Sequence, residues 1–195
     1  MLHQVGRLFL AAAAIFLGGC ANHFGVSGAD YKLGSAPQGE GLVAFSSRYV
    51  FACNNVIMGP VNPYLHFAKG DSQFGAMMYN PLLPYHFENP PGYFYVLSKP
   101  AGDYLAKDLE VTHAQMNYQL PIAQQASFRV REGKVTYVGE ITVQVTGCKD
   151  GGGGVNGKVT LSVANQWESR DRALFAERVP NVDSNAVVVD LLKLR

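Results

Sequence analysis

The sequence has no apolar run long enough to cross a membrane. Its longest run, Leu8–Leu17, contains ten apolar residues, whereas a helix needs about 20 to span a bilayer. The net charge is close to zero too, because the chain has 16 basic and 15 acidic residues. Non-specific binding to nucleic acid depends on clustered Lys and Arg. The composition therefore argues against both a transmembrane protein and a nucleic-acid-binding one.

Signatures of known catalytic and metal sites are missing as well. No G-x-S-x-G nucleophile turn occurs, and none of the five histidines belongs to a local metal motif such as H-E-x-x-H. The stretch Gly152–Lys158 has the spacing of a phosphate-binding loop, but Val159 replaces the required Ser or Thr and a strand-like segment follows. Asp108 and Glu110 alternate on one predicted strand face, which we expect to point towards water. The sequence thus predicts a protein that is not an enzyme and holds no metal.

Cysteine is scarce, with only three in the chain. Cys53 and Cys148 lie in the body of the sequence, where an oxidising compartment would favour a disulfide between them. Linking residues this far apart restricts the unfolded chain by about 4–5 kcal/mol in the entropy model. The alternative interpretation is a pair of buried free thiols.

The third cysteine, Cys20, follows a segment typical of secretion. A weakly basic start, the apolar run and Gly18-Gly19 have the order of a signal peptide. Leu17-Gly18-Gly19-Cys20 resembles the lipobox of bacterial lipoproteins, in which the cysteine becomes the first mature residue. The sequence accordingly predicts a signal peptide at 1–19, a lipidated cysteine and flexible tether at 20–40, and one domain at 41–195. A signal peptide with a chance cysteine, or a buried apolar helix, is the alternative.

The lipobox resemblance implies a membrane anchor in place of a spanning helix. Cys20 would carry diacylglycerol and a further acyl group such as palmitate, and two or more chains hold a protein stably on a membrane. No other cofactor is expected. Ala21 stands where aspartate marks retention at the inner membrane in enteric bacteria. The resemblance therefore places the protein on the outer membrane, facing the periplasm.

The remaining sequence has the patterns of a β-protein. Short segments rich in aromatic and β-branched residues alternate with Gly, Pro and Asn, which favours strands joined by turns. Predicted strands include 41–52, 127–130, 135–146 and 158–164, with a turn at Glu132-Gly133. A helix is expected from a Ser169 cap to Pro180, and 186–195 is predicted as a last strand. The fold class is a mostly antiparallel β-sandwich with one short helix near the C-terminus.

The segment 135–146 has the clearest period of two. Val135, Tyr137 and Ile141 fall on one predicted face, and Thr136 and Glu140 fall on the other. Gly139 interrupts the apolar face, which predicts a bulge or a close contact at that position.

A second resemblance covers roughly residues 95–195. The stretches "GDYLAKDLEV" and "FRVREGKVTYVGEI", followed by a helix before a proline, are similar to a group of uncharacterised bacterial envelope lipoproteins. Gly133, Tyr137, Val138 and Gly139 match the second hairpin of that group. The resemblance implies an immunoglobulin- or prealbumin-like sandwich, and it brings no catalytic residues with it.

Aromatic residues gather in one quarter of the chain. Between Tyr49 and Tyr95 lie eleven of its 22 Phe, Tyr and Trp residues, and prolines in this region prevent regular strand pairing. We predict a contact surface within Met78–Val96, carried by Tyr85, Phe87, Tyr93 and Tyr95. The alternative is a loop that packs its own rings as a small core.

These observations predict a non-catalytic, lipid-anchored envelope protein that binds a protein partner. A glycan- or peptidoglycan-binding module that uses the same aromatic rings is the second hypothesis. A hydrolase with an unrecognised site is the third.

Overall fold

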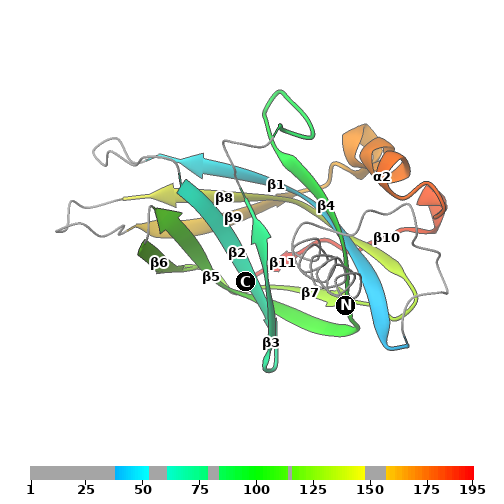
Figure 1. Cartoon of the computed structure of the whole chain (residues 1–195), viewed down its shortest axis with the longest axis horizontal. Coiled ribbons are helices and arrows are strands. Elements are labelled where there is room, and N and C mark those ends of the chain that lie inside the picture. Colours follow the sequence, from blue (N-terminus) through cyan, green and yellow to red (C-terminus); the bar gives the residue numbers. More distant parts are fainter. Residues whose placement is uncertain (1–37, 53–60, 79–83, 114–115, 148–156) are drawn as a thin grey trace, which may run out of the picture.

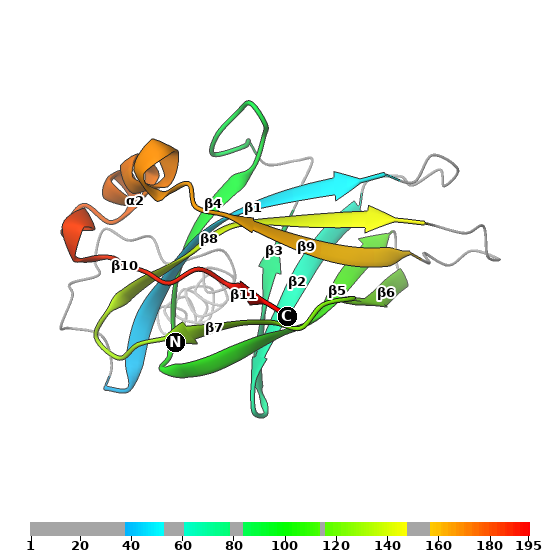
Figure 2. The same ribbon diagram turned by 180° about the vertical axis from the view of Figure 1, so that it is seen from behind.

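Strands dominate the chain and form two sheets that pack face to face (Figures 1 and 2). The computed structural model describes residues 38–52, 61–78, 84–113, 116–147 and 157–195. The strands in these ranges are β1 Glu40–Phe51, β2 Val61–Lys69, β3 Ser72–Met77, β4 Tyr93–Pro100, β5 Gly102–His113, β6 Met116–Pro121, β7 Ala126–Val130, β8 Val135–Thr146, β9 Lys158–Ala164, β10 Val188–Val189 and β11 Lys193–Leu194. The predicted β-sandwich class is confirmed.

Sheet A has the order β10-β8-β1-β4, and β9 pairs with the second half of β8. Its centre is a parallel pair, since β1 and β8 run in the same direction from Leu42 opposite Val135 to Phe51 opposite Val145. Sheet B has the order β11-β7-β5-β2-β3, with β6 beside β5, and all its pairings are antiparallel. The parallel pair in sheet A is a feature that local sequence patterns do not reveal.

Side chains and loops join the two sheets along both of their open sides. On one side the Tyr95 hydroxyl of β4 donates to the Met77 carbonyl of β3 at 2.6 Å, and Lys99 lies 4.7 Å from the centre of the Phe74 ring. On the other side the Ala123 N–H donates to the Val159 carbonyl at 3.0 Å. Contacts of this kind occupy strand edges that would otherwise be open to pairing.

The described residues form two apolar cores. The larger lies between the sheets and contains Phe45, Phe67 and Ile141. The smaller lies on the outer face of sheet A, beneath helix α2 (Arg172–Arg178), and contains Phe94, Tyr137 and Phe175. The architecture is therefore three layers, namely sheet B, sheet A and a short helix.

A bulge in β8 changes which of the two cores the alternate side chains of this strand face. Gly139 has φ +104°, and the register with β1 shifts between Ala44 and Ser46, as the prediction of a bulge requires. A Cβ at Gly139 would lie 2.7 Å from Val163 Cγ1, so the close contact is present as well.

The predicted assignment of faces along β8 is wrong because of this bulge. Tyr137 packs against the helix, whereas Ile141 packs between the sheets. An extra residue in a strand moves every later side chain to the opposite face. Glu140 consequently lies on the helix side, on a different face from Thr136, and it is buried. Thr136 is itself buried.

The C-terminal region differs from its prediction in two places. The helical segment begins as a π-helical turn at Trp167–Asp171 and continues as α2. Ser169 is not its cap, because its hydroxyl bonds to Gln166 inside the turn. The predicted last strand is two short ones in different sheets, since β10 pairs with β8 and β11 pairs with β7. The chain end thus crosses from sheet A to sheet B.

Candidate functional site

A projecting loop, residues 84–92, precedes β4. The His86 N–H donates to the Gly92 carbonyl at 2.9 Å, and the Gly92 N–H donates to the Phe87 carbonyl at 3.1 Å. The residues between them, 88–91, are all exposed. Figures 1 and 2 both show this loop extending from the start of β4 on the side of the sandwich that carries α2. The loop combines a hydrogen-bonded base with an exposed tip.

The four predicted contact residues lie at the base of this loop and on β4. Tyr85, Tyr93 and Tyr95 form a continuous group, with ring centres 5.4 Å apart for the first pair and 6.4 Å apart for the second. Phe87 is separate and lies beneath Arg170, 3.6 Å from its guanidinium carbon. Tyr93 is 2% exposed and Phe87 is 8% exposed, so most of their surface packs within the protein. Tyr85 and Tyr95 are only partly buried, which leaves surface for a partner.

His86 fixes the base of the loop to β4. Its Nδ1 lies 2.8 Å from the Phe94 nitrogen, and that N–H donates to the ring. The imidazole also makes edge contacts with Tyr93 and Tyr95, at 5.3 and 6.4 Å between ring centres. Burial lowers the pKa of His86, and the nearby Arg178 cation lowers it further. The ring therefore favours its neutral form.

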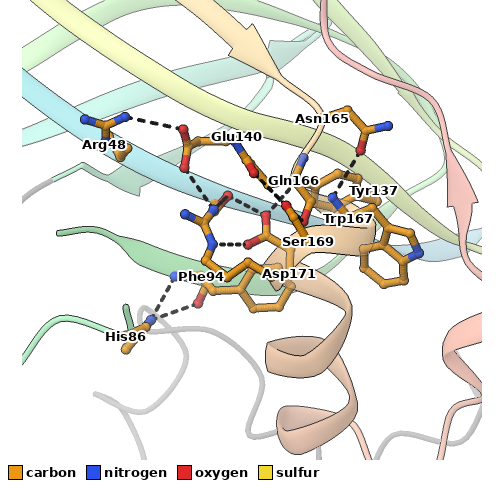
Figure 3. A network of polar contacts seen from close by, with 12 residues as sticks. Arg48, His86, Phe94, Tyr137, Glu140, Asn165, Gln166, Trp167, Ser169 and Asp171 are labelled. Atoms are coloured by element: carbon orange, nitrogen blue, oxygen red, sulfur yellow. Dashed lines mark hydrogen bonds and ion pairs between the residues drawn. The ribbon is translucent and has the colours of Figure 1, made fainter. Parts of the chain in front are cut away.

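Below the loop, an ion network connects the helical segment to sheet A (Figure 3). Arg170 donates through Nε to Asp171 Oδ1 at 2.7 Å and through Nη2 to Ser46 Oγ at 2.9 Å. The same Nη2 forms an ion pair with Glu140 Oε2 at 2.9 Å. Glu140 also faces Arg48, 3.5 Å away. The Arg170 side chain thus contacts the helical segment, both central strands and, through Phe87, the projecting loop.

Asp171 is the most deeply buried charge of this network, with no exposed surface. Its Oδ2 accepts from the Ser46 hydroxyl and from the Tyr137 hydroxyl, each at 2.6 Å. Burial raises the pKa of Tyr137, and the Asp171 carboxylate raises it further. Burial by itself would lower the pKa of Arg170, but hydrogen bonds and charges from Asp171 and Glu140 outweigh it and raise that pKa.

The network attaches the helical segment to sheet A. A buried carboxylate is stable only when it is paired and hydrogen-bonded, and Asp171 accepts three such bonds from Ser46, Tyr137 and Arg170. Ser46 is fully buried and donates to a carboxylate, so its hydroxyl is not placed to attack a substrate. The sequence patterns did not predict the contact between Ser46 and Asp171, because these residues lie 125 positions apart.

A second polar group lies on sheet B. His66 on β2 places Nδ1 2.9 Å from Asp108 Oδ1 and Nε2 3.6 Å from Glu110 Oε2. The two carboxylates do share a face, as predicted, but both are only about a quarter exposed, at 24% and 23% of the side chain. They flank opposite sides of one ring and therefore do not converge on a common point. Within the described ranges, no group of three His, Cys, Asp or Glu side chains is arranged to hold a metal ion.

Several predicted features fall outside the described residues, namely the signal peptide 1–19, Cys20, the tether up to residue 37, Cys53, Cys148, residues 79–83 of the predicted contact segment and most of the glycine-rich stretch 152–158. The disulfide stays a prediction. Its flanking residues are described, however: Phe51 is opposite Val145 in the parallel pair, and the Ala52 N–H donates to the Val145 carbonyl at 2.9 Å. Adjacent strands lie about 4.8 Å apart, so the chain leaves β1 and β8 at neighbouring points. In the part of the chain that is described, no helix has the length and apolar character needed to span a bilayer.

Comparison with known proteins gives no relative. No known protein family, curated protein or solved structure matches the chain. The function therefore has to be argued from the sequence and from the geometry of the loop and the network.

Proposed function

We propose that the protein is a non-catalytic, lipid-anchored protein of the bacterial cell envelope that binds a protein partner through its projecting loop. The anchor is Cys20, and the domain faces the periplasm from the outer membrane. The observation that carries the binding role is the contrast within residues 84–92, where the base is bonded to β4 and the tip is exposed.

A fixed loop is well suited to recognition. Ordering a flexible loop on binding costs free energy, and a loop that is already held in one conformation avoids most of that cost. Here Arg170 stacks on Phe87 and His86 accepts from Phe94, so two neighbouring residues at the base of the loop are attached to the body of the protein. Tyr85, partly buried beside Tyr93, adds an aromatic ring next to the tip, and tyrosine is common in recognition surfaces.

The glycan-binding alternative uses the same rings in a different way. Sugars stack on open aromatic faces, and Tyr93, at 2% exposure, offers almost none. Tyr85 remains the one partly exposed ring of the Tyr85–Tyr93 pair. This arrangement favours a protein partner, which can contact the polar loop tip, over a polysaccharide.

A capture experiment from detergent-solubilised envelope tests the proposal. Wild-type protein should retain a stoichiometric protein partner, and the variants Tyr85→Ala and Glu88→Ala should retain much less without a change in melting temperature. Leu105→Ala is the matched control, because Leu105 is a large apolar residue that is 45% exposed on β5 of sheet B. Tyr93→Ala should instead lower the melting temperature by several degrees, since its ring is buried. Retention on peptidoglycan without a protein partner would favour the glycan hypothesis.

The anchor is tested separately by labelling cells with a radioactive or clickable fatty acid. Wild-type protein should incorporate the label and lose residues 1–19. The Cys20→Ala variant should carry no label and should accumulate as a precursor or as a soluble product. Label that persists in the variant would exclude Cys20 as the lipidation site.

A further inference from the structure

The hydrogen bond from the Phe94 N–H to His86 requires an Nδ1 that carries no proton. A backbone N–H is always a donor, so Nδ1, 2.8 Å from the Phe94 nitrogen, must present its lone pair. The Phe94 carbonyl lies 3.1 Å from the same Nδ1. A proton on Nδ1 would point at that carbonyl and leave the Phe94 N–H facing another donor. The hydrogen bond from the Phe94 N–H therefore forms only with the neutral ring that carries its hydrogen on Nε2.

The groups around the ring disfavour a second positive charge. From α2, the Arg178 cation faces His86. A hydrogen bond to the Phe94 carbonyl and the Glu177 carboxylate would each favour a charged ring, but together they do not outweigh burial and Arg178. From β4, the rings of Tyr93 and Tyr95 contact the imidazole, and both burial and neighbouring tyrosines raise the pKa of Tyr95, which keeps it uncharged. Within the loop, Tyr85 packs against Tyr93. Burial and Arg178 together lower the pKa of His86 below the ordinary histidine value of 6.5.

His86 holds the base of the loop through both its backbone and its side chain. Its backbone N–H closes the base through the Gly92 carbonyl, and its side chain joins that base to β4 through Phe94. The other attachment, Phe87 beneath Arg170, belongs to the next residue in the chain. A displacement of the His86 ring would therefore act directly on the segment that also holds Phe87.

We propose that His86 is a proton-operated latch that holds the projecting loop in place when its ring is neutral and releases it when the ring is protonated. As a regulator of partner binding, the latch depends on the function proposed above. As a structural device, it does not.

The direction of the pH effect follows from linkage. The attached loop binds a proton on His86 less tightly than the released loop does, so lowering the pH favours release. The attached form is fully favoured above about pH 6.5, the ordinary value for histidine. The population of the attached form decreases as the pH falls from that value to the pKa of the attached ring. Below that pKa the ratio of the two forms no longer changes with pH. Each unit by which that pKa is lowered permits about a tenfold rise in the ratio of released to attached loop.

Nuclear magnetic resonance of the full-length protein in detergent tests the latch without any partner. Two quantities are followed between pH 7.5 and 4.5: the ring signals of His86 and the hydrogen-exchange protection factor of the Phe94 amide. We expect His86 to titrate below 6.5 from the neutral tautomer with hydrogen on Nε2. The Phe94 protection factor should fall over the same range, by about tenfold for each pH unit that the measured His86 pKa lies below 6.5. His66→Asn should leave this response unchanged.

The informative variant is His86→Asn, because the Asn side-chain oxygen can take the place of Nδ1 as acceptor but does not titrate. Phe94 should stay protected throughout the pH range in this variant. The proposal is overturned if His86 titrates at or above 6.5, or if Phe94 protection in the wild type is constant through the titration. Equal loss of protection in the Asn variant also overturns it. If the wild type shows the latch and no partner is captured at any pH, the latch stands and the binding function fails.

Discussion

The outer faces of the two sheets carry similar charged side chains in opposite environments. On sheet A, α2 covers the face, and the carboxylates of Asp171 and Glu140 are 0% and 5% exposed. On sheet B, Asp103 and Arg129 form a bidentate pair with both bonds at 2.7 Å, although they are 63% and 61% exposed. The geometry of single contacts is thus nearly the same on both faces.

The difference teaches that burial, and not contact distance, decides what an ion pair contributes. Exposed pairs are screened by water and add little to stability. Removing one member of a buried pair is costly, because the other member keeps its charge without a partner. The network under α2 therefore determines the position of the helical segment on sheet A. The pair on sheet B lies on a solvent-exposed surface and contributes little to stability. The projecting loop is attached to this buried network, through the contact of Phe87 with Arg170.

The sharpest way to test this contrast is to remove Asp171. Asp171→Ala leaves Arg170, Ser46 and Tyr137 without their shared acceptor in a buried site. We expect the free energy of unfolding to fall by about 3–5 kcal/mol, as measured by urea titration. Ser169→Ala, in the same turn but with an exposed hydroxyl that bonds only to Gln166, should change it little. A loss of less than about 1 kcal/mol for Asp171→Ala would mean that burial does not dominate.

The predicted disulfide would add a covalent tie to sheet A alone, because no sheet B strand contains cysteine. Non-reducing digestion of protein trapped in acid should release a peptide that links Cys53 to Cys148. Replacement of both by Ser should cost about 2–4 kcal/mol of unfolding free energy. Recovery of two freely alkylated thiols from the wild-type protein would rule out the pairing.

The bulge that brings Glu140 into the network can be tested through its glycine. Gly139→Ala places a Cβ 2.7 Å from Val163 Cγ1 at φ +104°, and we expect a loss of about 2–3 kcal/mol in thermal or urea unfolding. Gly133→Ala is the matched control, because Gly133 also has a positive φ, +62°, but open space around its Cα. It should lose only about 1 kcal/mol. Equal losses would show that the contact with Val163 is unimportant.

The smallest effect is expected on sheet B. Hydrogen bonding to Arg129, together with its charge, lowers the pKa of Asp103 below 3.8. The pair therefore favours folding above that value, and its contribution disappears as the pH falls through the lowered pKa. In Arg129→Ala, nuclear magnetic resonance should show Asp103 titrating closer to 3.8, with no measurable change in the urea midpoint at pH 7. A midpoint shift as large as that of Asp171→Ala would remove the contrast between the two faces.

The strands were predictable because their signals are local. The alternation in 158–164 and the turn at Glu132-Gly133 rest on neighbouring residues, and β9 and the positive φ of Gly133 confirm them. β6 was not predicted. The helix was placed correctly within a few residues, but its first turn is π-helical and its Asp171 points into the protein. A period of two also gave the wrong face for Glu140, since a single bulge residue reverses the assignment.

The sequence by itself determined the class of fold, the Gly139 irregularity and the concentration of aromatic rings before β4. Each of these depends on residue type and on spacing over a few positions. Only the tertiary structure decided that β1 and β8 run parallel, that Ser46 meets Asp171, and that Arg170 reaches Phe87. Such contacts join segments more than 80 residues apart in the chain. Ser46 meets Asp171 because a buried charge must find partners wherever the fold places it, and no local pattern encodes that choice.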